Sequence, residues 1–214
     1  MYIDLHAHTY PASDDSFISA DDLVDGAKRA GLDGICLTEH DNFWLPEDVQ
    51  ALAKRHSFLV LAGAEINTED GHVLVFGLHQ YQFGMHKVSF LRQQVLEAGG
   101  AMVAAHPYRR RYPRGRYPSR EQVDEALERA RGEELFGLCS AIEVVNGRGR
   151  EEENQFSRAL CEGLGLPGTG GSDIHREEHI GRACTRFHHR VSCLDDLVRE
   201  LNQGACEAEA GYRA

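Results

Sequence analysis

Short apolar runs alternate with longer segments of mixed polarity along this chain, and that alternation restricts the possible folds more than any other feature of the sequence. The runs expected to form strands are residues 2–5, 34–38, 58–65, 72–78, 101–105, 141–145 and 166–173, and the segments expected to form helices are residues 19–31, 46–56, 88–98, 119–131, 151–164 and 194–204. Strands that alternate with helices of ten or more residues are typical of a parallel sheet that is buried on both faces. Six or seven such units in 214 residues favour a closed or nearly closed α/β barrel over an open sheet. We therefore expect a single domain over residues 1–214, which is long enough to bury a core.

Charge and cysteine content narrow the function classes. The 34 acidic and 23 basic residues give a formal net charge of −11, which argues against stable binding to duplex nucleic acid or to a membrane. No apolar run approaches the roughly 20 residues that span a bilayer, and the N-terminal residues lack the basic and apolar regions of a signal peptide. The six cysteines are scattered without a C-x-x-C pair, which is typical of reduced thiols. The sequence thus predicts a cytoplasmic protein.

Histidine and carboxylate residues recur at the ends of the predicted strands. His6 and His8 lie two residues apart, so an extended chain points both imidazoles to the same side. The other polar residues at strand ends are His40, Asp41, Glu65, His106, Asn146, Asp173 and His175, and His72 begins its strand. Because the carboxyl ends of barrel strands converge on one face, we expect these side chains to form one site. Each residue alone would also fit a solvated loop, a helix cap or a structural histidine.

The ligand types predict a reactive metal centre. Imidazole nitrogen and carboxylate oxygen without cysteine suit manganese, iron or zinc, and do not suit a closed structural zinc site. The candidate ligands are too many for one ion, so we expect two or three divalent transition metal ions with a carboxylate between them. Such clusters hold a hydroxide at neutral pH and bind both oxygens of an in-line phosphoryl displacement.

Seven motifs, in order, resemble those of the PHP (polymerase and histidinol phosphatase) superfamily. They are DLHAHT, GLDGICLTEHD, GAEI, GHVLVFG, AHP, IEVVNGR and GTGGSDIH. The resemblance runs from residue 3 to about residue 187, where IGRACTRF is similar to the closing strand of the family. It implies a distorted (β/α)7 barrel, a trinuclear metal centre and phosphoesterase activity.

The resemblance also implies which residues hold each metal. The first metal would be held by His6, His8, Glu65 and Asp173. The second would be held by His40 and His175 with an acidic or histidine residue that follows the first motif, and the third by Glu65, His72 and His106. Two further carboxylates, Asp4 and Asp41, would orient imidazole rings.

Two of these positions have alternatives. Two neighbouring residues are candidates for the acidic ligand of the second metal. The position next to Ser13 favours Asp14, whereas the distance from the following helix favours Asp15. His79 is an alternative to His72, although GHVLVFG matches the family pattern better with His72 as the ligand.

A basic, tyrosine-containing stretch directly follows His106. Its arginines are Arg109, Arg110, Arg111, Arg114, Arg116 and Arg120, and its tyrosines are Tyr108, Tyr112 and Tyr117. Guanidinium groups bind phosphate in bidentate fashion and tyrosine rings stack on bases, so this stretch would grip a small phosphorylated substrate, such as a nucleotide or a short oligonucleotide. The alternative is a solvated, proline-rich loop. Arg148, in the motif VNGRGR, is a second candidate for phosphate binding.

The predicted activity is metal-dependent hydrolysis of a phosphate ester. A metal-bound hydroxide would attack phosphorus, and the residues assigned to catalysis are Asp173, His175, Arg109 and Arg148. The general acid would be His175 or a metal-bound water, and monoesters and diesters are both open. An amidohydrolase-like metal hydrolase and a non-catalytic metal-binding regulatory domain are the competing hypotheses.

Overall fold

The strands in the described part of the protein form two mixed sheets of five strands each. The computed structural model describes residues 1–113 and 118–211. The first sheet has the order β10 (Cys206–Ala210), β9 (Ala183–Phe187), β1 (Tyr2–Asp4), β2 (Gly34–Leu37) and β3 (Leu59–Ala62). The second has the order β4 (Ala64–Asn67), β5 (His72–Phe76), β6 (Ala101–Ala104), β7 (Ala141–Asn146) and β8 (Gly168–Gly171). Pairing is parallel among β1, β2 and β3 and among β6, β7 and β8, and antiparallel elsewhere.

The predicted distorted (β/α)7 barrel is therefore wrong. The apolar run at residues 58–65 divides at Gly63 into β3 and β4, which lie in different sheets. Only residues 68–71 separate β4 from β5, and a parallel pair needs a crossover of a dozen residues or more, so these two strands pair antiparallel. In the described ranges, the isolated bridges that link the two sheets are Ala7 with Ile174 and His40 with Glu65, and no closed barrel forms. That the chain is one domain stays a prediction.

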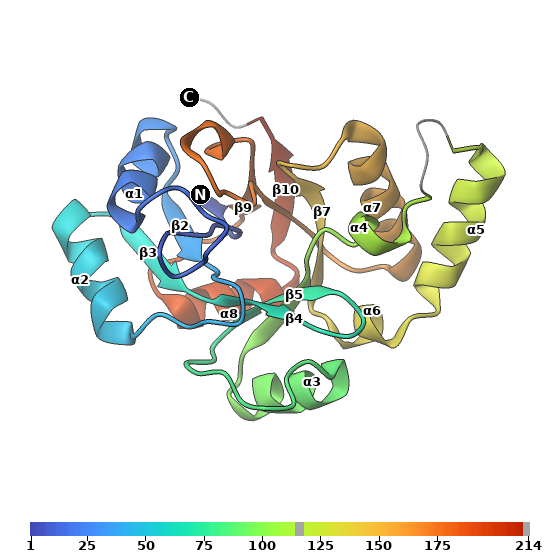
Figure 1. Cartoon of the computed structure of the whole chain (residues 1–214), viewed down its shortest axis with the longest axis horizontal. Coiled ribbons are helices and arrows are strands. Elements are labelled where there is room, and N and C mark those ends of the chain that lie inside the picture. The colour runs from blue at the N-terminus through green and yellow to red at the C-terminus, as the bar shows by residue number, and fades with distance from the viewer. Residues whose placement is uncertain (114–117, 212–214) are drawn as a thin grey trace.

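Helices cover the outer sides of both sheets (Figure 1). Their bounds are α1 (Ala20–Arg29), α2 (Pro46–His56), α3 (Val88–Glu97), α4 (Tyr108–Arg111), α5 (Arg120–Arg131), α6 (Glu134–Leu138), α7 (Glu151–Leu164) and α8 (Leu194–Gln203), with a 3-10 turn η1 (Glu177–His179). The helix α1 begins where expected, because the Ser19 hydroxyl accepts a hydrogen bond from the Asp22 amide at 3.1 Å. Pro46 opens α2, where a missing N–H costs nothing. The short helices α4 and α6 and the strand β10 were not expected from the sequence.

One apolar cluster joins the two sheets beneath the polar strand ends. It contains Leu5, Cys36 and Leu61 from the first sheet side and Leu74 and Val103 from the second. Successive side chains of a strand point to opposite faces, so Leu5 enters this core while its neighbours along the chain, which include candidate ligands, point away from it. The packed core thereby fixes the positions of the segments that carry the site.

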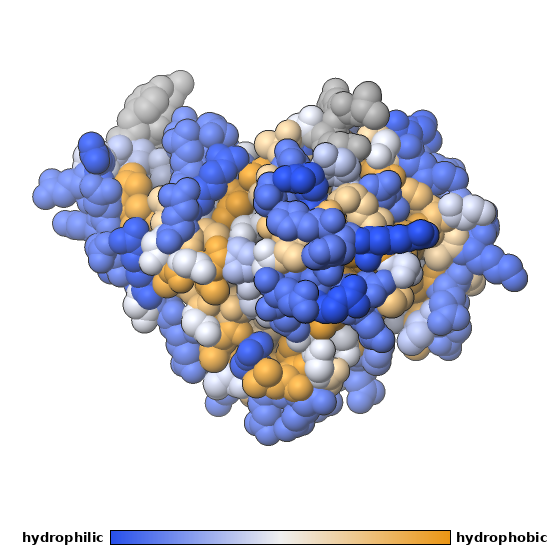
Figure 2. All heavy atoms as spheres, turned by 180° about the vertical axis from the view of Figure 1, so that it is seen from behind, coloured by the Kyte–Doolittle hydropathy of each residue, from blue (hydrophilic) through white to orange (hydrophobic). Residues whose placement is uncertain are grey.

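Polar side chains cover most of the molecular face in Figure 2, and apolar residues reach the surface in small areas between them. No helix in the described part of the chain has both the length and the apolar character needed to cross a bilayer.

Candidate metal centre

The structure brings together eight side chains from separate segments of the chain. These are His6 and His8 after β1, His40 after β2, Glu65 in β4, His72 at the start of β5, His106 after β6, and Asp173 and His175 after β8. They form overlapping groups of three residues whose potential ligand atoms lie within 4.8 Å of one another. Strand ends that are far apart in the sequence therefore meet at one point, as the sequence analysis expected.

The Glu65 carboxylate lies at the centre of the cluster and contacts rings on two sides. Its Oε1 atom lies 2.8 Å from His72 Nδ1 and 2.8 Å from His106 Nε2. Its Oε2 atom lies 3.0 Å from His40 Nδ1 and 3.3 Å from His8 Nε2. The side chain is 1% exposed. A carboxylate with a separate set of rings at each oxygen has the arrangement needed to bridge two metal ions.

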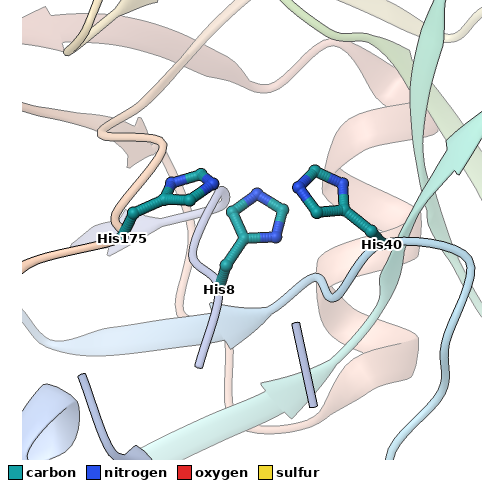
Figure 3. Close-up of side chains that lie close together, drawn as sticks. All are labelled: His8, His40 and His175. Carbon is teal, nitrogen blue, oxygen red and sulfur yellow. The ribbon is translucent and has the colours of Figure 1, made fainter. Parts of the chain in front are cut away.

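A second group consists of the rings of His8, His40 and His175, which point toward one another in Figure 3, with His8 between the other two. Asp15 adds a carboxylate here, because its Oδ2 atom lies 3.0 Å from His175 Nε2 and 3.4 Å from His40 Nε2. No hydrogen bond or ion pair joins Asp14 to these rings in the described residues. Of the two alternatives for the acidic helper, the geometry places Asp15 in the site.

Asp173 faces the same cluster from the end of β8. Its Oδ1 atom lies 3.3 Å from His175 Nδ1, 3.7 Å from His8 Nε2 and 3.8 Å from His6 Nε2. Its backbone has a φ of +55°, a left-handed conformation that is uncommon for a residue with a side chain. Asp173 also accepts hydrogen bonds from Arg109, through Oδ2, and from Arg148, at 3.4 Å.

Among the described residues, four buried polar atoms in this region form no hydrogen bond of normal geometry: Asp4 Oδ2, His6 Nε2, His8 Nε2 and Glu65 Oε2, the last despite its distance of 3.0 Å from His40 Nδ1. Burying a polar atom without a partner costs free energy, and such atoms are rare in folded proteins. Three of the four belong to candidate ligands, and His6 Nε2 and His8 Nε2 lie 3.4 Å and 3.3 Å from Glu65 Oε2. The residues present therefore fit a divalent metal ion, which would give these atoms a partner.

The carboxylates of the cluster are held in their ionised form. Burial raises the pKa of Glu65, but the surrounding imidazoles, above all His6, outweigh burial and keep that pKa well below its usual range. Burial likewise raises the pKa of Asp173, yet His6 and Arg109 hold it below its usual range. Ionised carboxylates are the form that binds metal.

The imidazoles divide into two kinds. Burial lowers the pKa of His8 well below its usual range and also lowers the pKa of His106, which favours the neutral form that ligates metal. Burial opposes protonation of His6 as well, but the carboxylates of Glu143 and Glu65 outweigh it and raise the pKa of His6 well above its usual value. The site thus attracts positive charge at His6, which a bound cation would supply.

Asp4 and Asp41 were expected to orient imidazole rings, but their hydrogen bonds go to backbone amides. Asp4 Oδ1 accepts hydrogen bonds from the backbone amides of His6 and Ser172, at 3.1 and 2.9 Å, and Asp41 Oδ1 accepts from the amide of Asn67. Neither forms a hydrogen bond to an imidazole in the described residues. The carboxylate of Glu143 contacts the Nδ1 atom of the His6 ring instead, a role that the sequence analysis missed. Its signal was an acidic residue in the centre of the apolar strand AIEVV, because a buried charge needs partners.

The arginines of the basic stretch after His106 contact different parts of the protein. Arg109 reaches the cluster, whereas Arg110 donates to the carbonyls of Thr68 and Glu69, and Arg111 pairs with Glu133. Arg111 also donates to the Asp70 carbonyl at 2.6 Å, so both arginines hold the turn between β4 and β5.

The remaining aromatic and basic positions that the structure describes make contacts within the protein, and their predicted grip on a substrate stays a prediction. Tyr108 is buried, with its hydroxyl donating to Asn146, and Tyr112 packs edge-on against Phe156. Arg120 is exposed and pairs with Asp124. Three predicted members of the loop lie outside the described residues: Arg114, Arg116 and Tyr117.

His79 is exposed and does not join the cluster, whereas His72 does. Of the two alternatives for this ligand position, the geometry places His72 in the site.

Comparisons with known proteins agree with this geometry. A family model described as PHP domain matches residues 4–150, and one described as PHP-associated matches residues 151–206. Uncharacterized protein MJ1587 of Methanocaldococcus jannaschii is 25% identical over 162 residues, which cover 71% of this chain and 85% of that protein.

Solved structures share the fold. A two-domain protein from Bacteroides vulgatus, described as containing a predicted PHP-like metal-dependent phosphoesterase, matches 99% of this chain with a TM-score of 0.66 and 23% identity. This chain spans only 65% of the length of that protein. PsfC from Pseudomonas syringae PB-5123 matches with a TM-score of 0.64 and 22% identity, over 98% of this chain and 91% of that one. With the PHP model covering residues 4–150 and a buried histidine–carboxylate cluster that suits a metal hydrolase, this chain belongs to the PHP family.

Proposed function

We propose that this protein hydrolyses phosphate esters with two or three divalent transition metal ions, manganese, iron or zinc, held by the histidine–carboxylate cluster. The observation that carries the proposal is the convergence of the partnerless atoms His6 Nε2, His8 Nε2 and Glu65 Oε2 beside Asp173. These atoms are buried and come from two segments, the residues after β1 and the strand β4, so a shared ligand explains them together.

The ligand groups overlap, which supports more than one ion. The groups are His6, His8 and Glu65; His6, His106 and Asp173; Glu65, His72 and His106; and His8, His40 and His175, the last with Asp15 beside it. Divalent ions at these positions supply Lewis acidity, which lowers the pKa of water and offsets the charge that develops on phosphoryl oxygens. All the remaining steps fall to residues of the chain.

Arg109 and Arg148 would bind the phosphate group. They come from α4 and from the segment after β7, and their guanidinium groups reach different oxygens of Asp173. Arg148 Nη1 also lies 3.2 Å from His175 Nδ1. Guanidinium groups bind phosphate oxygens in bidentate fashion and remain charged at all relevant pH values. With a metal ion held by Asp173, the charge of this carboxylate would be shared, and Arg109 and Arg148 would become available to an anionic substrate.

A proton for the leaving group would come from His175 or from water. His175 Nε2 lies 3.0 Å from Asp15 Oδ2 at the edge of the cluster, so His175 would act as the donor only where Nε2 carries a proton and does not ligate metal. Asp15 is half-exposed, so a leaving group can approach from its side. The substrate would be a small phosphorylated molecule, of which nucleotides and short oligonucleotides are examples.

Metal content and phosphate release test the proposal directly. Purified protein loaded with manganese or zinc should contain two or three equivalents of metal and release product from p-nitrophenyl phosphate or from bis-p-nitrophenyl phosphate. His72→Ala and Asp173→Asn should lose metal and activity together. His79→Ala is the matched control, because His79 is exposed outside the cluster and its loss should change neither.

Failure of wild-type protein to retain metal after reconstitution would refute the proposal. Metal binding without turnover of any mono- or diester would instead favour the non-catalytic hypothesis. An amidohydrolase-like site that uses a lysine ligand is disfavoured, because all three lysines, Lys28, Lys54 and Lys87, are exposed and outside the cluster.

A further inference from the structure

Glu143 is a buried carboxylate that contacts two ligand-bearing segments at once. It lies in β7, is 1% exposed, and belongs to none of the proposed ligand groups. Its Oε1 atom lies 2.9 Å from His6 Nδ1. Its Oε2 atom accepts hydrogen bonds from the backbone amide of His106 at 2.8 Å and from Asn146 Nδ2 at 3.0 Å. One side chain therefore holds the segment after β1 and the segment after β6.

The contact with His6 determines which ring nitrogen is free. An ionised carboxylate only accepts hydrogen bonds, so His6 Nδ1 must carry a proton. The lone pair then belongs to Nε2 when the ring is neutral, and Nε2 is the partnerless atom that lies 3.4 Å from Glu65 Oε2. Glu143 thus selects the tautomer of His6 that can bind metal.

The contact with His106 holds a backbone conformation. His106 has a φ of +27°, which residues with a side chain rarely adopt. The hydrogen bond from its amide to Glu143 stabilises that turn, and the turn places His106 Nε2 2.8 Å from Glu65 Oε1.

Asn146 extends the same network to Asp173 and Arg148. Its Nδ2 atom lies 3.0 Å from Glu143 Oε2 and 3.3 Å from Asp173 Oδ2, and its Oδ1 atom accepts from the Arg148 amide at 3.0 Å. The network therefore reaches both Asp173, a proposed metal ligand, and Arg148, which is proposed to bind phosphate.

We infer that Glu143 is the positioning residue of the metal centre: it fixes the tautomer of His6 and the backbone turn at His106, and Asn146 links it to Asp173. The inference rests on the proposed function in that it requires a metal to bind at these residues. Glu143 itself contacts neither metal nor substrate in this assignment.

Glu143→Gln is the decisive variant because glutamine has the same shape but only one acceptor oxygen. If that oxygen faces His6, the amide NH₂ faces the two donor groups of His106 and Asn146, and the hydrogen bonds to them are lost. With the oxygen toward those donors, the NH₂ opposes His6 Nδ1 and favours the proton on Nε2, which blocks metal binding. Either orientation breaks one of the two contacts.

Cobalt binding provides a readout that does not depend on activity. Co²⁺ titration of metal-free protein against a chelating dye gives affinity and stoichiometry, and the visible absorption of bound Co²⁺ reports ligand geometry. We expect Glu143→Gln to bind Co²⁺ about 10–100-fold more weakly, the usual effect of removing a carboxylate behind a ligating histidine, with a changed absorption spectrum.

Glu200→Gln is the matched control. Glu200 is equally buried, at 1% exposed, and accepts a hydrogen bond from His189 Nδ1 at 2.8 Å, but it lies in α8 outside the cluster. Its loss should lower stability without changing Co²⁺ affinity or the spectrum. Wild-type affinity and spectrum in Glu143→Gln would overturn the inference, as would an equal loss of affinity in Glu200→Gln.

If Glu143→Gln does not fold, Glu143→Asp takes its place, because the shorter side chain keeps the charge but cannot reach both His6 and His106. Wild-type Co²⁺ affinity in that variant overturns the inference equally. Wild-type protein that binds Co²⁺ but hydrolyses no phosphate ester would refute the proposed function alone. Wild-type protein that binds no Co²⁺ would refute both.

Discussion

Replacing Gly171 with alanine would push a methyl group into the contact between the end of β8 and the segment that carries His6. A Cβ atom at Gly171 would lie 2.5 Å from His6 Cβ and 2.6 Å from Glu143 Oε1. Ordinary van der Waals contact begins at 3.4 Å, so His6 would have to move by about 0.9 Å, the difference between 3.4 Å and 2.5 Å. The obstructing atom is a Cβ, which moves only with its backbone, so the strain cannot be relieved by a simple side-chain rotation.

Overpacking of this kind costs about 1–3 kcal/mol of unfolding free energy. For a chain of this length each kcal/mol lowers the melting temperature by about 2–4 °C, so we expect a decrease of about 2–12 °C in metal-free protein. Co²⁺ affinity should fall as well, because the shift displaces His6 from its present position beside Glu65 and Asp173. Differential scanning calorimetry and the cobalt titration measure the two effects separately.

Gly137→Ala is the matched control, because nothing lies within 4 Å of a Cβ at this position in α6. It should leave Co²⁺ affinity unchanged and leave stability unchanged or raise it by up to about 1 kcal/mol, since alanine favours helix over glycine. A Gly171→Ala protein that melts within about 1 °C of wild type and binds Co²⁺ normally would show that the packing argument for this contact is incorrect.

Three further predictions concern metal, pH and the turn between β4 and β5. Removal of metal by a chelator should abolish ester hydrolysis and lower the melting temperature, and added metal should restore both. A ligand at about 100 times its Kd stabilises a protein by about 2.7 kcal/mol, so an unchanged melting temperature would contradict this prediction. The carboxylates of Asp21 and Asp25 accept hydrogen bonds from His56 and raise its pKa above 6.5, so the stabilisation by His56 relative to His56→Gln should be full below pH 6.5 and disappear as pH rises through the raised value; urea unfolding at several pH values measures it, and a gap that grows with pH would be the wrong sign. Arg111→Ala should lower stability by about 1–3 kcal/mol, because Arg111 pairs with Glu133 and donates to the Asp70 carbonyl at 2.6 Å; Arg111→Lys should lose less, and equal stability of Arg111→Ala and wild type would exclude the anchoring role.

Much of the candidate site could be predicted from the sequence because most candidate ligands stand at the end of a recognisable strand-like run. His6, His40 and Asp173 stand directly after strand-like segments, and a strand end places its polar residue at the edge of a sheet. The structure brings these residues together, and their roles as metal ligands stay proposals. The choice of Asp15 over Asp14 could not be made from the sequence, because both follow Ser13 in an irregular segment and only the positions of His40 and His175 distinguish them.

The role of Glu143 was hidden for a different reason. Its neighbours in AIEVV are apolar, so the strand was recognisable, but its partners His6 and His106 are 137 and 37 residues away in the chain. The same holds for the basic stretch, where composition alone could not separate Arg109, which reaches Asp173, from Arg111, which holds a turn.

The sequence by itself determined the positions of the longer helices and of most strands and the chemical types of the candidate ligands, because burial period and helix caps are local properties of the chain. It did not reveal α4, α6, β10 or the division between β3 and β4. Tertiary structure alone decided the direction of the strands, and so replaced a closed barrel with two mixed sheets. It also decided which carboxylate lies at the centre of the cluster, which one contacts the far side of an imidazole ring, and which arginine faces the cluster. These outcomes depend on hydrogen bonds between residues far apart in the chain, and such pairings leave no local pattern in the sequence.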